Sequence, residues 1–216
     1  MRKGWLAILI LLHQFNALGQ RIPTSSLSGG PSLDINPSQA ARGRQSDKST
    51  PINNSHFQTL DGKAFELARL HKKLIAVVFL SSECPLCQNY SLVLNKLQTR
   101  FENDLDVVGV FPGKSEQIAS CRMFRKKYNI QFILLTDTLR KLDGLLGARI
   151  TPEVFLLDHN KNLIYHGAID NWVVALGTTR IKTTENYLED GVEEFLNGTP
   201  VKIKEKPAIG CLINNF

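Results

Sequence analysis

The chain has 216 residues, of which 43% are hydrophobic, and a formal net charge of +6. A chain of this length can bury a core by apolar packing, so its four cysteines do not indicate a fold held together mainly by disulfides. The basic residues form no cluster dense enough to indicate nucleic-acid binding, and the runs at 125–127 and 202–206 are better explained as solvated surface.

Residues 1–19 have the pattern of a secretory signal peptide. Arg2 and Lys3 precede an apolar stretch, and Ala17-Leu18-Gly19 is a small-residue cleavage site. The apolar stretch is too short to span a bilayer comfortably, so we expect cleavage and no stable membrane insertion afterwards. Cleavage would leave 24 basic and 20 acidic residues, a net charge of +4. The mature chain would work in a periplasmic or secreted, oxidising environment, where disulfides persist.

Residues 20–53 are rich in Ser, Pro, Gly, Asn and Gln and lack apolar periodicity, which predicts a disordered linker. Residues 54–213 are predicted to form one domain. The predicted strands span residues 57–60, 74–80, 105–111, 132–135, 154–157 and 163–166. The predicted helical segments span residues 65–71, 85–101, 115–127 (capped by Ser115), 138–146 and 184–196. Two strand–helix–strand crossovers followed by a hairpin predict an α/β fold, with a central mixed sheet and helices on both faces.

Cys84-Pro85-Leu86-Cys87 is placed where the apolar strand at 74–80 gives way to a helix. A helix N-terminus favours a thiolate, and a spacing of three puts both cysteines on one helical face, within reach of a disulfide. Half of a zinc site is the alternative, but no second Cys or His pair at ligand spacing is present. A pair of buried core thiols is the other alternative. The arrangement predicts a redox-active pair.

The chain resembles the thioredoxin-like superfamily, and more narrowly its exported redoxin branch, which includes thiol reductases and peroxiredoxins. The residues that carry the resemblance are the cysteine turn, the segment 147–158 with Thr151-Pro152, the segment 165–170, and Gly210-Cys211. The resemblance implies a thioredoxin-like three-layer sandwich. It also implies that a cis peptide bond precedes Pro152, and that the backbone of Thr151 pairs with an extended substrate segment facing the cysteines.

The leading interpretation is a thiol–disulfide oxidoreductase that acts on protein thiols or disulfides, or with a redox donor protein, and uses no cofactor and no metal. Cys84, expected at the helix end next to solvent, would attack. Cys87, one turn further in, would resolve the mixed disulfide. Glu83 would relay a proton or, more simply, be a solvated loop carboxylate.

Cys211 is a candidate third redox cysteine, because an extended tail after the last helix can reach across the domain. A structural disulfide with Cys121 and a free thiol are equally open for it. Cys121 itself is expected to be a buried, inert thiol.

Two further functions stay open. A peroxiredoxin-like thiol peroxidase would use Cys84 as the peroxidatic cysteine and would need an arginine nearby, for which Arg149 is the candidate. Such enzymes carry a threonine three residues before that cysteine, where this chain has Ser81. A copper-binding chaperone would combine the two thiolates with His159 or His166.

Overall fold

The computed structural model describes residue 52 and residues 56–213. The predicted signal peptide (residues 1–19) lies outside the described residues. The predicted linker (residues 20–53) also lies outside them, except for Ile52. The side chain of Ile52 packs, partly buried, against the core of the domain. Within the described ranges, no helix combines the length and apolarity needed to cross a membrane.

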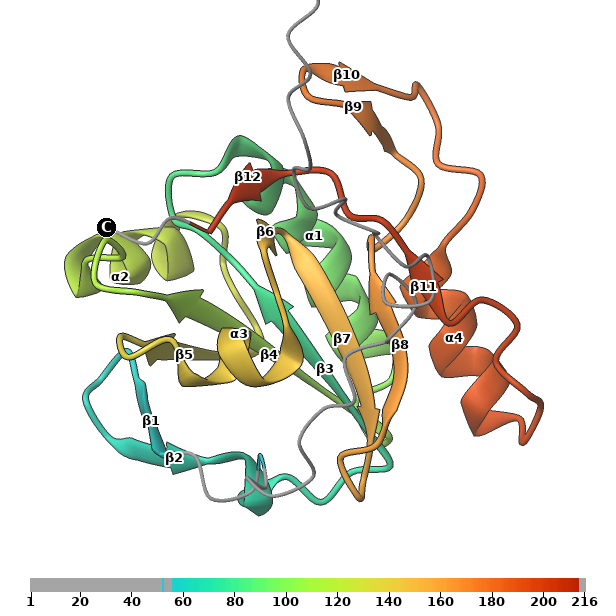
Figure 1. The fold of residues 1–216 in the computed structure, drawn as a ribbon, viewed down its shortest axis with the longest axis horizontal. Helices are drawn as coiled ribbons and strands as arrows, with labels where there is room; N and C mark the ends of the chain where they lie inside the picture. The colour runs from blue at the N-terminus through green and yellow to red at the C-terminus, as the bar shows by residue number, and fades with distance from the viewer. Residues whose placement is uncertain (1–51, 53–55, 214–216) are drawn as a thin grey trace, which may run out of the picture. The chain divides into compact units, whose positions relative to one another are not determined.

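A mixed sheet of eight strands forms the centre of the described domain (Figure 1). Its strands follow the spatial order β11-β8-β7-β3-β4-β5-β1-β2. They are β1 (His56–Thr59), β2 (Ala64–Glu66), β3 (Leu74–Phe79), β4 (Leu105–Pro112), β5 (Ile133–Asp137), β7 (Glu153–Asp158), β8 (Leu163–Gly167) and β11 (Glu205–Lys206). β3, β4 and β5 are parallel, whereas β7 runs antiparallel to both β3 and β8.

Helices cover both faces of this sheet. They are α1 (Pro85–Arg100), α2 (Ile118–Lys127), α3 (Lys141–Leu146) and α4 (Tyr187–Leu196). Figure 1 shows α3 in front of the sheet and α1 behind it. Both faces of β3 are therefore covered, which explains why its sequence is apolar throughout.

The side chains of β3 alternate between two cores, as the pleat of a strand requires. Leu74, Ala76 and Val78 contribute to the core beneath α1 and α4, whereas Ile75 and Val77 contribute to the core beneath α3. This alternation across a covered sheet confirms the predicted three-layer α/β fold. The layers bury the end of β3 on both faces, and the candidate site follows directly after it.

The boundaries of several elements differ from the predictions. α2 begins at Ile118 and has Gln117 as its N-cap, so the predicted start with a Ser115 cap is wrong. The reason is that Glu116 binds Ser82 on the loop after β3. Of the one or two helical turns predicted within 65–71, one is present, a 3-10 turn at Leu67–Arg69, because the preceding residues form β2 and pair with β1.

Two small sheets were not predicted. β9 (Val173–Ala175) pairs with β10 (Thr178–Thr179), and β6 (Ile150–Thr151) pairs antiparallel with β12 (Cys211–Leu212). The second pair joins the C-terminal tail to the segment just before Pro152, and Figure 1 shows β12 crossing beside β6 at one end of the large sheet. The tail therefore ends at the candidate site.

Candidate redox site

The loop between β3 and α1 places Cys84 at the N-terminus of the helix. Cys84 is the N-cap residue of α1, and Pro85 occupies the first helical position. Proline suits this position because the N–H group that it lacks would have no partner in the helix. Cys87 lies one turn further in and is fully buried, and its sulfur accepts a 3.4 Å hydrogen bond from the backbone N–H of Ser81. The two cysteines thus share one helix end, as predicted.

The thiols of Cys84 and Cys87 ionise at very different pH values. The pKa of Cys84 is lowered to about 5, mainly by a hydrogen bond from the Cys87 thiol. Hydrogen bonds from the Cys211 thiol and from backbone N–H groups of the first helical turn lower this pKa further, whereas burial raises it. Burial, followed by the neighbouring Cys84 sulfur, raises the pKa of Cys87 well above its usual range. At neutral pH Cys84 is therefore the thiolate and Cys87 the thiol.

The segment before β7 faces this pair. The peptide bond between Thr151 and Pro152 is cis, and the carbonyl oxygen of Thr151 lies 3.4 Å from the Sγ atom of Cys84 in a buried contact. Both features confirm the predicted placement of this segment. The roles of Thr151 and Pro152 in substrate binding stay predictions.

Cys211 reaches the same place from the C-terminal tail. In the β6–β12 pair Cys211 lies opposite Thr151, and the Thr151 hydroxyl donates a 3.4 Å hydrogen bond to the Cys211 carbonyl oxygen. The Cys211 thiol points at Cys84, and the two Sγ atoms are 2.8 Å apart. Of the roles considered for Cys211, this placement favours the redox role over a structural pairing with Cys121.

The attacking cysteine is less accessible than predicted. Cys84 is only 2% exposed, so the expectation that it lies next to solvent is wrong. The cause is the tail, since β12 lies across the end of α1 with Cys211 against the Cys84 sulfur. A cavity of about 280 Å³ adjoins the site and has Cys84, Thr151 and Cys211 among its lining residues. Reagents therefore approach Cys84 past a half-buried Cys211.

Glu116 is a site residue that the sequence reasoning missed. Its Oε2 atom accepts hydrogen bonds from the backbone N–H of Ser82 at 3.1 Å and from the Ser82 hydroxyl at 2.8 Å. Glu83, the acid that was considered, is exposed. The sequence contains a signal for this contact. Ser82 follows β3 and Glu116 follows β4, and segments that follow parallel neighbouring strands meet at one edge of the sheet.

Cys121 is fully buried in α2. Burial, together with the nearby Glu116 carboxylate, raises the pKa of Cys121 to about 12. A thiol that stays protonated and is shielded from solvent reacts slowly, which agrees with the predicted inert role.

The described lining of the cavity at Cys84 includes none of the candidate residues Arg149, His159 and His166. Arg149 is exposed, and the described lining of the cavity at Cys84 contains no arginine. His159 is exposed in the turn after β7. His166 stacks on Phe155 with ring centroids 5.6 Å apart, and its Nε2 atom lies 3.5 Å from a carboxylate oxygen of Glu205. Over the part of the chain that the structure covers, no three His, Cys, Asp or Glu side chains form a group that could hold a metal ion.

A helix-flanked mixed sheet, a cysteine pair at the start of a helix and a cis-proline segment facing that pair define the class of protein: a thioredoxin-like oxidoreductase. A sequence model of the AhpC/TSA family matches residues 49–166, which is more than half of the chain. The chain belongs to the AhpC/TSA family. No curated protein matches the sequence.

Two of the solved structures that match share the fold over most of this chain. A hypothetical protein from Sinorhizobium meliloti 1021 is 26% identical, with a TM-score of 0.68 over 76% of this chain and 92% of the other. An uncharacterized conserved protein from Geobacillus kaustophilus is 18% identical, with a TM-score of 0.69 over 76% of this chain and 90% of the other. A secreted disulfide oxidoreductase from Mycobacterium tuberculosis aligns at 20% identity and a TM-score of 0.46, over 50% of this chain and 79% of the other.

Proposed function

We propose that the protein is an exported thiol–disulfide oxidoreductase that exchanges disulfides with protein substrates through Cys84 and Cys87. The observation that carries the proposal is the contrast between the two sulfurs: the pKa of Cys84 is lowered to about 5, and that of the buried Cys87 is raised. Such a pair supplies one ready nucleophile and one reserve thiol, which is what disulfide exchange requires.

The exchange has two steps. The Cys84 thiolate attacks one sulfur of a substrate disulfide, forms a mixed disulfide with it, and releases the other substrate sulfur as a thiolate. Cys87 then loses its proton and attacks the Sγ atom of Cys84, which forms the Cys84–Cys87 disulfide and releases the second substrate thiolate. The substrate gains two electrons and the cysteine pair loses two. The same steps in reverse oxidise a substrate dithiol.

The raised pKa of Cys87 fits the order of these steps. Part of the shift is caused by the negative charge on Cys84. That charge disappears when Cys84 enters a mixed disulfide, so Cys87 becomes easier to deprotonate when its attack is needed. We propose that the backbone of Thr151 holds the substrate segment meanwhile by strand pairing, with Pro152 beside it.

A thiol peroxidase with Cys84 as the peroxidatic cysteine is the second candidate, and membership of the AhpC/TSA family favours it. The exposed Arg149 and the absence of arginine from the described cavity lining speak against it. Insulin reduction and peroxide consumption, measured in parallel, separate the two. We expect insulin reduction that Cys84→Ser abolishes, whereas rapid peroxide consumption without insulin reduction would overturn the proposal.

Export and domain organisation are part of the proposal. We propose that residues 1–19 are removed as a signal peptide, that residues 20–53 link the signal to the domain, and that residues 54–213 form the redoxin domain in a periplasmic or secreted setting. N-terminal sequencing of the protein recovered after secretion-competent expression tests this. A start at Gln20 is expected, and a protein that keeps Met1 would contradict it.

A further inference from the structure

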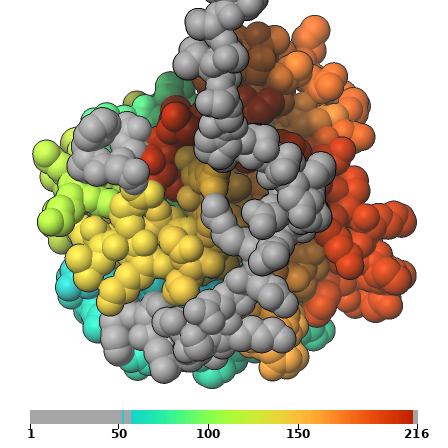
Figure 2. Space-filling view, in the orientation of Figure 1, coloured from blue at the N-terminus to red at the C-terminus, as the bar shows by residue number. Residues whose placement is uncertain are grey.

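The C-terminal tail occupies the position that the proposed function gives to a substrate. β12 pairs antiparallel with β6, and Cys211 lies opposite Thr151. The backbone N–H of Ile213 also donates a 2.9 Å hydrogen bond to the carbonyl oxygen of Arg149. The sulfur of Cys211 lies 2.8 Å from that of Cys84, where the sulfur of a bound substrate would have to lie. In Figure 2 the red atoms of the tail lie against yellow atoms of the chain near residue 150.

Gly210 makes this close approach possible. A Cβ atom at Gly210 would lie 2.1 Å from the carbonyl oxygen of Thr151 and 2.8 Å from Cγ2 of Ile150. Contacts this short are not tolerated between non-bonded atoms, and the first partner is backbone that cannot rotate away. Glycine is therefore required immediately before Cys211 for the tail to adopt this pairing.

Two short strand pairs attach the tail to the domain. β11 pairs in parallel with β8, and the Lys206 carbonyl oxygen accepts a 2.9 Å hydrogen bond from the N–H of Ala168. β12, like β11, is only two residues long, and the side chain of Leu212 is 72% exposed. The part of the tail that covers Cys84 is therefore held by a short strand pair that is separate from the β11–β8 pair.

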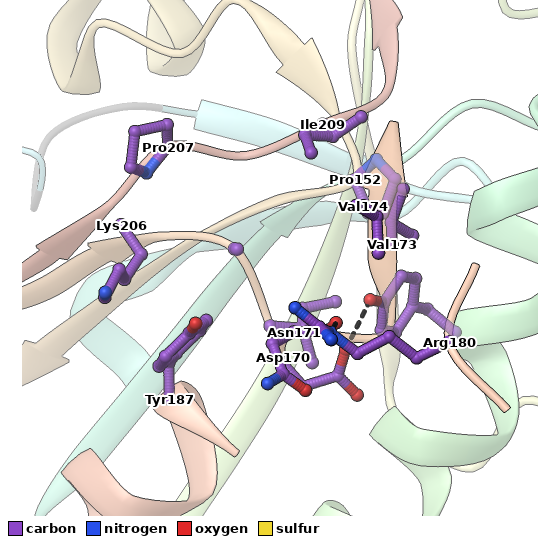
Figure 3. A pocket seen from close by; sticks show the side chains of 13 residues that line it. Pro152, Asp170, Asn171, Val173, Val174, Arg180, Tyr187, Lys206, Pro207 and Ile209 are labelled. Atoms are coloured by element: carbon purple, nitrogen blue, oxygen red, sulfur yellow. Dashed lines mark hydrogen bonds between the residues drawn. The ribbon is translucent and has the colours of Figure 1, made fainter. Parts of the chain in front are cut away.

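A second cavity follows the same tail. It measures about 210 Å³, and Pro152, Pro207 and Ile209 are among the residues that line it. Figure 3 shows Ile209 beside Pro152, with Arg180 reaching toward Asp170 and Asn171 below them. Successive parts of the tail thus line two cavities, and its departure would open a longer groove past Pro152, of the kind that an extended peptide needs.

We propose that residues 210–212 are an internal substrate segment, which occupies the groove beside Cys84 and Thr151 until an extended protein segment displaces it. The proposal rests on the proposed function and adds what the groove accepts. An incoming segment in the same register meets the same Thr151 oxygen, so the favoured substrates carry a glycine before their reactive cysteine. Because the tail is tethered, it competes at a high effective concentration.

Cys211 also takes part in exchange. After a protein disulfide has oxidised the Cys84–Cys87 pair, the Cys211 thiolate attacks the Sγ atom of Cys84. The Cys84–Cys211 bond forms as the Cys84–Cys87 bond breaks, and Cys87 leaves as a thiolate. Cys87 then takes up one proton, which balances the proton that Cys211 lost. One sulfur is oxidised and one is reduced, so no external oxidant is consumed.

The test displaces the tail without removing a cysteine. Gly210→Val introduces the clash with Thr151, and Ile203→Val places the same side chain on the same tail at an exposed position before β11, outside the groove. Iodoacetamide labelling of Cys84 at pH 7, followed by mass spectrometry, should be faster by about tenfold or more in Gly210→Val and unchanged in Ile203→Val. Equal rates in all three proteins would overturn the proposal.

Further measurements keep the outcome decisive. If Gly210→Val does not fold, Ile213→Pro removes the N–H donor to Arg149 and the packing of the Ile213 side chain against the core, and should give the same acceleration. The tail variants could show faster labelling of Cys84 although neither they nor the wild type reduces insulin. That result would support a groove occupied by the tail and would overturn protein disulfide exchange as the function. Peptide mapping after oxidation with glutathione disulfide should find a Cys84–Cys211 linkage. A Cys211 that stays fully alkylatable after oxidation would overturn the exchange step.

Discussion

The Sγ atoms of Cys84 and Cys211 lie 2.8 Å apart, although 127 positions separate the two residues in the sequence. Cys84 is thereby placed between two thiols, because Cys87 approaches it from within α1 and Cys211 from the tail. Both thiols donate hydrogen bonds to its sulfur, and both stabilise the thiolate form. The same contacts that activate Cys84 therefore provide two alternative partners for a disulfide.

The pH dependence of Cys84 labelling follows from its lowered pKa. The iodoacetamide rate at Cys84 should rise through a midpoint near pH 5 and be constant from about pH 7 upward, because only the thiolate reacts. Labelling of Cys121 should be negligible over this range, since its pKa is raised to about 12. Peptide-resolved mass spectrometry measures both rates. A midpoint for Cys84 near pH 9, the ordinary thiol value, would contradict the assignment.

Cys211→Ser should raise the pKa of Cys84. The Cys211 thiol is one of the groups that hold this pKa down, and a serine hydroxyl has a shorter reach than a thiol. The midpoint of the labelling curve should therefore move to higher pH. Cys121→Ala is the matched control and should leave the midpoint in place, because Cys121 is not among the causes of the shift. A downward shift in Cys211→Ser would refute the hydrogen bond.

Ionisation of Cys84 should make the reduced protein more stable at higher pH. The pKa of Cys84 is about 5 in the folded protein, compared with an ordinary value of 9.0. Between these two pH values the unfolded chain therefore binds a proton at Cys84 that the folded protein does not bind. The free energy of unfolding consequently rises with pH over this range. The contribution is complete above about pH 9 and is lost as the pH falls through 5. The gain is at most about 1.4 kcal/mol per pH unit. Urea unfolding of wild type and Cys84→Ser gives it by difference, and a difference independent of pH would disprove it.

Glu116 should stabilise the loop that carries the cysteines. Glu116→Ala removes the acceptor for the N–H and the hydroxyl of Ser82, and we expect the free energy of unfolding to fall by about 1–3 kcal/mol. Glu83→Ala, at an exposed position on the same loop, should change it by less than about 0.5 kcal/mol. Equal effects of the two substitutions in urea unfolding would show that Glu116 has no special role.

The core of the site was predictable because its signals are local. The apolar run of β3, the proline after Cys84 and the spacing to Cys87 lie within one short segment, and sequence patterns describe such segments well. The cis bond before Pro152 could also be predicted, although from a family resemblance rather than from the residues alone.

The parts that escaped prediction depend on contacts between distant segments. β6 and β12 have two residues each, too few to show any periodicity, and they exist only because the tail returns to Thr151. The burial of Cys84 follows from that return, so a local argument expected exposure. The start of α2 failed for the same reason, because Glu116 binds Ser82 rather than the helix.

The central claim is that Cys84 attacks a protein disulfide and that Cys87 releases the product. Reduced Cys87→Ser/Cys211→Ser protein, in which neither thiol beside Cys84 can release a bound substrate, tests it most directly when it is mixed with insulin, quenched with an alkylating reagent and mapped by mass spectrometry. The account predicts a mixed disulfide that joins an insulin cysteine to Cys84, and none in a Cys84→Ser protein treated in the same way. An insulin adduct on Cys87 of the Cys84→Ser protein, or no adduct on Cys84 in the double variant, would contradict it.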